Sequence, residues 1–207
     1  TDRFGVDNLR YFLMREVAFG QDGSYSAEAI VNRCNAELAN SFGNLVQRVL
    51  SMIAKNMDGT IEDFEPNGDD KALLGKVRSA CIEELPAEFE KLAFSHGIEA
   101  WIQAVWACNV YVDEQAPWAL RKSDEARMRV VLLTLFVAIR ELALAIVPVI
   151  PGKADEVLRQ LGVATDARTA GTLADDGWFR DLVARGHVVA KPEPIFPRLE
   201  LPEPEPA

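Results

Sequence analysis

One segment constrains the fold of this chain more than any other, the nearly continuous apolar run over residues 130–150. Drawn as a helix, residues 128–147 place apolar side chains on every side and leave no face for water. Arg140 and Glu141 interrupt the run and two prolines close it, which favours a buried helix over a membrane span. A helix of this kind belongs in the middle of a bundle, and the other helices must cover it.

The remaining helices are predicted from apolar residues spaced three or four positions apart. Ser26 is expected to cap a helix that runs to about Asn56, where Gly59 stops it. The other expected segments are a short helix before a loop at residues 20–23, a long helix from Asp69 or Asp70 with a core face reaching Leu92 and a bend at Pro86, a helix over 95–113, a helix that begins near Ser123, and a helix over 152–161.

The fold class that follows is all-α, an antiparallel helix bundle with an irregular carboxyl extension. The helical period is lost from about residue 163, where Gly, Asp and Pro punctuate the chain. We therefore divide the 207 residues into a linker segment (1–25), a helical domain (26–162) and an extension (163–207) whose Pro-Glu tail is expected to be disordered.

The charge distribution restricts the kind of ligand that the chain can bind. The net charge of −10 excludes a broad phosphate-wrapping surface, which would need clustered basic residues. Residues 58–70 alone hold six acidic groups and no basic one, whereas residues 113–129 balance four acidic against four basic side chains. A small, nearly neutral patch that binds nucleic-acid bases is still compatible with this composition.

Catalytic and metal-binding patterns are absent from the sequence. The three cysteines are widely spaced within apolar helical patterns and form neither a CxxC nor a Cys/His zinc motif, so we expect no metal, no disulfide and a reduced, cytoplasmic setting. His96 and His187 lie in no catalytic spacing, and the adjacent carboxylates Asp113 and Glu114 are more often solvated or capping groups than a general acid/base pair. We expect no catalytic residue in this chain.

Two places far apart in the chain carry residues suited to binding an unpaired base. Asn44 and Arg48 lie one helical turn apart on the polar face of the first long helix, and Trp118 follows Pro117 in a turn. An amide offers a donor and an acceptor to a base edge, and a guanidinium offers a donor fork. An indole adds stacking, and single-stranded RNA loops are recognised in this way. Taken singly, each residue is more often an ordinary polar-face or core residue.

These residues lie in stretches that resemble the carboxyl-terminal part of bacterial methionyl-tRNA synthetases, a class I family. The most specific stretch is the Asp-Glu-Gln-Ala-Pro-Trp string at residues 113–118. The other similar stretches follow the family's order along nearly the whole chain, at residues 4–13, 19–23, 31–40, 43–45 and 195–200.

The resemblance implies a role for each of these residues in binding the CAU anticodon of tRNA for methionine. It implies that Trp118 stacks on the first anticodon base, a cytosine, that Asn44 and Arg48 hydrogen-bond to that base or its neighbours, and that Pro117 shapes the turn. Residues 1–25 resemble the segment that contacts the tRNA stem, and the closing stretch resembles one that folds back toward the catalytic domain. The partners implied are the tRNA anticodon stem-loop and that catalytic domain, with no membrane.

Departures from the family pattern limit what the chain is expected to do. The HIGH and KMSKS motifs, which bind ATP in class I synthetases, are missing, as is a zinc knuckle. The chain is therefore expected to be an inactive fragment without a cofactor, cut from a monomeric parent that joins methionine to tRNA using ATP with magnesium. The alternative left open is a helical protein–protein interaction bundle, which the acidic balance and the many apolar helix faces favour.

Overall fold

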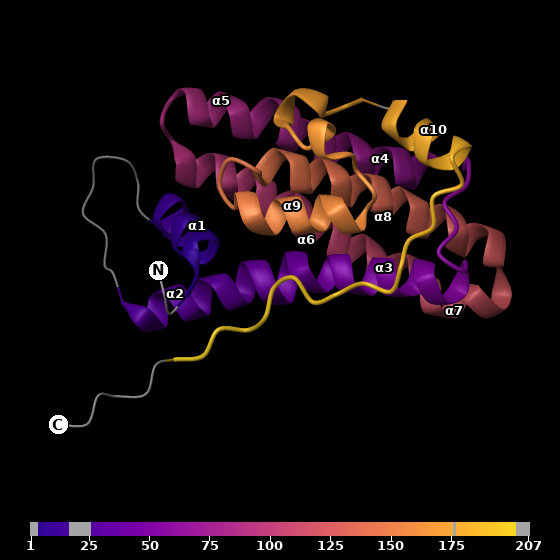
Figure 1. Cartoon of the computed structure of the whole chain (residues 1–207), viewed down its shortest axis with the longest axis horizontal. Helices are drawn as coiled ribbons and strands as arrows, with labels where there is room; N and C mark the ends of the chain where they lie inside the picture. Colours follow the sequence, from indigo (N-terminus) through magenta and orange to yellow (C-terminus); the bar gives the residue numbers. More distant parts are fainter. Residues whose placement is uncertain (1–3, 17–25, 176, 202–207) are drawn as a thin grey trace.

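The computed structural model describes residues 4–16, 26–175 and 177–201, which form a helical bundle (Figure 1). Within these ranges the β-type pairing consists of one isolated bridge, between Thr60 and Val188. The predicted loop at residues 20–23 and the predicted disorder after residue 201 fall outside the described residues. The described α-helices are α1 (Val6–Glu16), α2 (Ala27–Cys34), α3 (Asn44–Asn56), α4 (Gly68–Arg78), α5 (Leu85–Glu90), α6 (Phe94–Gln115), α7 (Pro117–Ser123), α8 (Glu125–Ile146), α9 (Pro151–Gln160) and α10 (Gly177–Ala184).

Helix α8 lies at the centre of the bundle, which confirms the prediction from the apolar run. Every residue from Ala138 to Ile146 is buried, including Arg140 and Glu141, whose side chains pair at 3.0 Å between Nη1 and Oε1. Helices α3, α4, α6, α7 and α9 all contact α8. Within the described ranges no helix is both long and apolar enough to cross a membrane.

The first long helix forms as one continuous rod, with a change of hydrogen-bond pattern in its middle. Ser26 caps it as predicted, because its Oγ accepts from the backbone N–H of Ala29 at 3.0 Å. Between α2 and α3 lies the π-helical segment η1 (Asn35–Gly43), and α3 then continues to Asn56. We call α2, η1 and α3 together the first rod. Such π-helical turns are rare and occur frequently at functional sites.

The second long helix also contains a π-helical segment, η2 (Ser79–Glu84), between α4 and α5. Pro86 occupies the first turn of α5, so the predicted bend takes the form of wider turns directly before the proline. The helix begins after Asn67, whose side chain and that of Asp70 form a capping box. The predicted core face extends too far, because the helix ends at Glu90 and Leu92 is 46% exposed.

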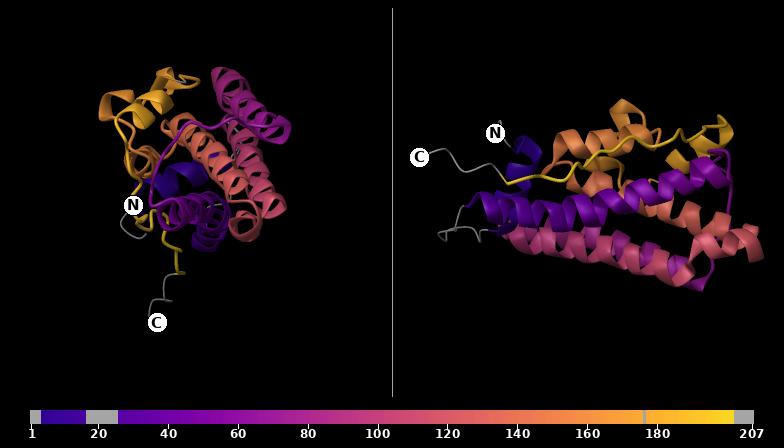
Figure 2. Two further views of the ribbon diagram at one scale, coloured as in Figure 1. Left: turned by 90° about the vertical axis from the view of Figure 1, so that its right-hand side faces the viewer. Right: turned by 90° about the horizontal axis from the view of Figure 1, so that it is seen from below.

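The order of contacts shows that consecutive long helices run antiparallel, as predicted. Between the second long helix and α6, Asp70 contacts Tyr111 at one end, while the ring of Phe89 lies against Gly97 at the other. Between α6 and α8, the Nε1–H of Trp101 donates to the carbonyl of Leu142 at 2.9 Å. The first rod and α6 are separated by one helix in the chain order and therefore lie parallel, side by side (Figure 2, right).

The carboxyl extension is more ordered than its sequence pattern indicates. It contains the short 3-10 segments η3 (Thr165–Ala167) and η4 (Ala170–Thr172) and the helix α10, none of which is among the predicted elements. Trp178 of α10 stacks on Phe136 of α8, with ring centroids 5.6 Å apart. After α10, residues 190–201 have no helix or strand and run along the first rod (Figure 1). We call residues 194–199 the strap.

Candidate nucleic-acid interface

The turn that carries Trp118 is built from a left-handed residue followed by a proline. Ala116 has φ 43° and ψ 59°, which ends α6 because an L-residue in this region cannot continue a right-handed helix. Pro117 then takes the first position of α7, where its missing N–H costs no hydrogen bond. Pro117 is buried, and Trp118 points outward with 48% of its surface exposed. The turn predicted to carry Trp118 is therefore a short helix that presents the indole.

A buried ion pair holds this turn in place from below. Arg127 donates to both carboxylate oxygens of Asp70, at 2.6 and 2.8 Å, and to Oε1 of Gln115 at 2.7 Å. The hydroxyl of Tyr111 also donates to Asp70. Since Gln115 is the last residue of α6, the pair fixes the point where the chain turns toward Trp118.

Asp70 stays ionised within this network although it is fully buried. Desolvation by burial raises the pKa of its carboxyl, but the hydrogen bonds from Arg127, Tyr111 and the backbone of Asn67 outweigh it, and the net pKa lies below the ordinary value. Burial and the neighbouring carboxylate raise the pKa of Tyr111, so its phenol remains a donor. Asp70 thus belongs to the structural core, although the sequence count placed it among the six acidic groups of residues 58–70.

The structure brings Arg48 and Trp118 together. The Cζ atom of Arg48 lies 5.5 Å from the centroid of the Trp118 ring, within the range of a cation–π contact. Nη2 of Arg48 donates to Oδ1 of Asp113 at 2.9 Å, and the two side chains are 31% and 66% exposed. An ion pair this exposed contributes little stability, about 0–1 kcal/mol, so its main effect is to orient the guanidinium beside the indole.

Asn44 lies one turn before Arg48, at the crest of the first rod. It is exposed, and its side-chain amide forms no hydrogen bond with the part of the chain that the structure describes. Ser41 and Arg48 reach the flank of the rod that faces α6, whereas Asn40 and Gln47 lie on the opposite flank. No hydrogen bond joins Asn44 to Trp118 within the described residues.

The strap lies on that opposite flank and borders a groove of about 550 Å³ beside Asn44. Asn35 holds the strap through two hydrogen bonds to the backbone of Leu199, at 2.8 and 2.9 Å. The ring of Phe196 packs edge-on against Phe42, with centroids 5.7 Å apart. The residues lining the groove are Ala39, Asn40, Gly43, Asn44, Gln47, Pro194, Ile195, Phe196 and Arg198. The sequence pattern did not predict this groove, because its two walls lie near opposite ends of the chain.

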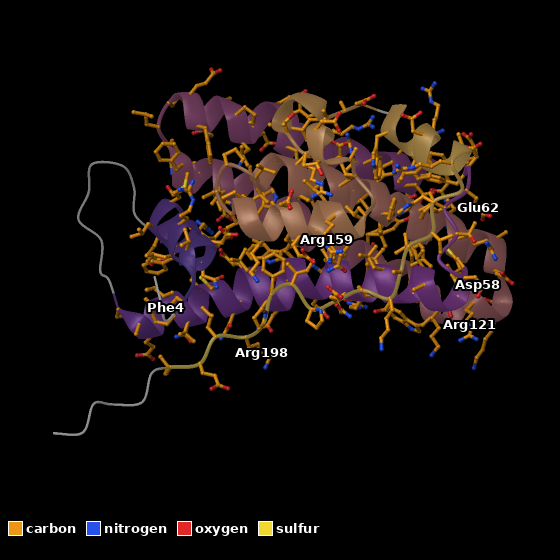
Figure 3. The ribbon with its side chains drawn as sticks, viewed as in Figure 1. Phe4, Asp58, Glu62, Arg121, Arg159 and Arg198 are labelled. Atoms are coloured by element: carbon orange, nitrogen blue, oxygen red, sulfur yellow. The ribbon has the colours of Figure 1, made fainter. Side chains whose placement is uncertain are left out.

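Two of the four basic residues counted in residues 113–129 are already paired in the structure. Arg127 is committed to Asp70, and Arg129 is paired with Glu62 and Glu125, at 3.2 and 2.9 Å. The exposed basic residues of α7 are Arg121 and Lys122, in the last turn of the short helix. Figure 3 labels Arg121. A basic pair in the last turn of an exposed helix that also carries an aromatic residue is a signal that the sequence predictions did not use.

The described residues contain no group of three or more His, Cys, Asp or Glu side chains that could hold a metal ion. Cys34, Cys81 and Cys108 are buried free thiols. The side chains gathered around Trp118 include the guanidinium of Arg48, the carboxylate of Asp113 and the indole itself.

Two known families match the chain. Residues 1–50 match the family described as tRNA synthetases class I (M), and residues 63–205 match the anticodon binding domain of methionyl tRNA ligase. The methionine–tRNA ligase of Brucella suis biovar 1 is 44% identical over 200 residues, and that of Mycobacterium leprae is 42% identical over 202.

Solved structures agree with these matches. Methionyl-tRNA synthetase from Mycobacterium tuberculosis in its free state is 40% identical, with a TM-score of 0.85 over 97% of this chain. The same enzyme in complex with methionyl-adenylate gives a TM-score of 0.83 at 39% identity over 95% of this chain. The match to the Brucella protein covers 96% of this chain. The chain nevertheless spans only 38% of the length of the Brucella protein and 40% of the free-state structure.

Proposed function

This chain belongs to the family of methionyl-tRNA ligase anticodon-binding domains, and on that premise we propose that it recognises the CAU anticodon of tRNA for methionine. The observation that carries the proposal is the pairing of an exposed indole with a guanidinium, Trp118 beneath Arg48 at 5.5 Å. Asn44 adds an exposed amide one turn away, which has no internal partner among the described residues. This combination offers stacking and hydrogen bonding to an unpaired base.

Each of the four residues then has a distinct role. Trp118 stacks on the first anticodon base, a cytosine, which contributes about 1–3 kcal/mol. Asn44 donates to and accepts from the edge of that base or its neighbours, and Arg48 donates to them. Pro117 belongs to the same anticodon-binding set, where it fixes the start of α7 and so the direction of the indole.

Asp113 leaves most of the Arg48 guanidinium available for a ligand. A guanidinium has five N–H donors, and the ion pair uses one of them, from Nη2. The other donors have no hydrogen-bond partner in the part of the chain that the structure describes. Arg48 is thereby oriented before the RNA arrives, which lowers the entropy lost on binding.

The activity of the whole protein is a separate part of the proposal. We infer that the enzyme containing this chain joins methionine to its tRNA using ATP with magnesium, as a monomer in the cytoplasm. The described residues offer no side-chain group suited to a metal ion, so we assign no step of that reaction to them. Their part is to bind the anticodon stem-loop while the catalytic domain of the same protein acts on the other end of the tRNA.

Titration of the chain with an anticodon stem-loop hairpin tests the proposal. Binding to the CAU hairpin should exceed binding to a hairpin whose first anticodon base is changed, and Trp118→Ala should reduce it by about 5-fold to 150-fold. Trp118→Phe keeps a ring and should lose less. Ile82→Ala is the matched control, since Ile82 is an exposed apolar residue of η2, on the second long helix, and it should bind like the unmodified chain.

Two results would contradict the proposal. Equal affinity for the CAU hairpin and a scrambled loop would show that no base is recognised. Loss of helical circular dichroism in Trp118→Ala would show that the indole supports the fold instead. Capture of a protein partner by a chain that binds no hairpin would favour the protein-interaction alternative.

A further inference from the structure

A second exposed tryptophan lies on the seam between the first rod and α6. Trp106 is 39% exposed, and its Nε1–H donates to Oγ of Ser41 at 3.2 Å across the seam. Seven residues further along both helices, Arg48 pairs with Asp113. The rod and α6 run parallel (Figure 2, right), so the two contacts are successive crossings of the same seam.

The hydrogen bond to Ser41 determines which part of the indole faces solvent. An indole has one polar atom, the Nε1–H donor, and that donor is already satisfied inside the chain. The exposed part of the ring is therefore its apolar surface, which gains nothing from water. Trp118 likewise exposes 48% of its surface.

Ser41 itself is held firmly by the π-helical segment η1. Its hydroxyl donates to the carbonyl of Ala36 at 2.8 Å while it accepts from Trp106. Its backbone carbonyl accepts from the side chain of Asn109, about one turn after Trp106 on α6, at 3.4 Å. Trp106 is thus anchored at a fixed place on the seam, which lowers the entropy cost of stacking a ligand on it.

Trp106 lies on the same seam as Arg48, one of the residues already assigned to base recognition. Seven helical residues correspond to a rise of about 10 Å, which separates the crossing at Ser41 from the crossing at Arg48. Asn44 projects from the rod between them. A rise of about 10 Å between the two crossings corresponds to about three stacked steps along one strand, given about 3.4 Å for each step.

We propose that Trp106 is a second stacking platform, which takes another unpaired base of the same RNA loop. This inference rests on the proposed anticodon recognition and extends it to a base beyond the one on Trp118. A protein partner fits the seam less well, because an apolar docking surface would be broken by Asn44, Arg48 and Asp113. Each unpaired base offers a face that stacks and an edge that forms hydrogen bonds. The seam likewise offers indole rings for stacking and the side chains of Asn44 and Arg48 for hydrogen bonds.

The test is a titration of the chain and its variants with the CAU hairpin and with hairpins that carry one abasic nucleotide at each loop position in turn. Trp106→Ala should weaken binding to the intact hairpin by about 5-fold to 150-fold, and Trp106→Phe by less. The loss in Trp106→Ala should vanish for one abasic hairpin, and that position should differ from the position at which the Trp118→Ala loss vanishes.

Val110→Ala is the matched control, because Val110 lies one turn from Trp106 on the same face of α6 and is 55% exposed but has no ring. It should bind within about twofold of the unmodified chain, since no stacking is lost. Equal losses for Trp106→Ala and Val110→Ala, or a Trp106→Ala loss of the same size with every abasic hairpin, would overturn the proposal.

The two proposals fail in different ways. If Trp106→Ala binds normally while Trp118→Ala and the anticodon change both weaken binding, the second platform is refuted and anticodon recognition stands. If the unmodified chain does not discriminate between hairpins, the proposed function fails first. A folded Trp106→Ala variant that loses a protein partner and no RNA would identify the seam as a protein-binding surface and refute the platform.

Discussion

Replacing Asp70 by Asn removes the charge at the centre of the network that supports the Trp118 turn. The carboxylate accepts two bonds from Arg127, one from Tyr111 and one from the backbone N–H of Asn67. An Asn side chain has a single acceptor oxygen, and its NH₂ group would face donors. Arg127 would stay largely buried without a counter-charge, since its side chain is 18% exposed.

The expected cost follows from this geometry. Breaking one partner out of a buried ion pair costs about 3–5 kcal/mol, in line with the loss of two charge-assisted hydrogen bonds at about 1.5–3 kcal/mol each. For a chain of this size the midpoint of thermal unfolding should fall by roughly 6–20 °C. Chemical unfolding followed by circular dichroism measures the free energy, and a thermal melt measures the midpoint.

Asp69→Asn is the matched control, because it makes the same chemical change at the neighbouring residue, which is exposed in the first turn of α4. It should lose only its favourable interaction with the helix amino terminus, about 0.3–1 kcal/mol. If Asp70→Asn costs no more than Asp69→Asn, the ion pair does not hold the turn and the reasoning is wrong.

The pH dependence of stability independently checks the direction of the Asp70 pKa shift. The folded pKa of Asp70 is lowered, so its contribution is fully present above the unfolded pKa of about 3.9 and is lost as the pH falls through the lower folded value. The stability gap between the unmodified chain and Asp70→Asn should therefore be constant from about pH 5 to about pH 8 and narrow below about pH 4. A gap that widened on acidification would contradict the assigned pKa direction.

Three other perturbations have defined outcomes. Gly43→Ala places a Cβ 2.9 Å from the Cβ of Phe196, so it should lower the free energy of unfolding by about 1–3 kcal/mol, measured by a thermal melt. It should also speed proteolysis of the strap, and an unchanged digestion rate would exclude this contact. Glu141→Gln weakens the buried ion pair with Arg140, and Arg140 also donates to the carbonyl of Thr172. Hydrogen exchange of residues 165–175 should therefore accelerate, while exchange of α1 should stay the same. Burial raises the pKa of all three thiols, to about 12 for Cys34 and Cys108 and well above its ordinary value for Cys81. A thiol reagent at about pH 8 should therefore react with them only as fast as the chain unfolds, and prompt reaction would refute their burial.

Sequence pattern predicts those elements whose cause is local. The central helix follows from apolar residues on every side, and the start of the first rod follows from Ser26, three residues before the N–H that it caps. Helix α7 could not be predicted in this way, because seven residues are too few to show a period. Its position depends on Ala116 in a left-handed conformation and on a bond from Arg127 to Gln115.

The candidate site is predictable only in part for the same reason. Asn44 and Arg48 could be placed on a polar face from their spacing alone. Trp118 lies far along the chain from Arg48, and only the packing of the first rod beside α6 brings the two within 5.5 Å. Helix α10 was not predicted because its period is weak beside glycines, and it is held by the stacking of Trp178 on Phe136 across the tertiary structure.

The bundle is elongated, so a small rotation at one end moves the other end by a larger distance (Figure 1). Phe4 of the amino-terminal segment and Arg121 of α7 lie at opposite ends of the molecule (Figure 3). The 22 residues of α8 alone correspond to about 33 Å of that length. A tilt of about 5° at the α1 end would therefore displace the far tip by about 3 Å, close to the thickness of one base. Close packing around the buried central helix resists bending, so the spacing between the two ends of the bundle is set by its fold.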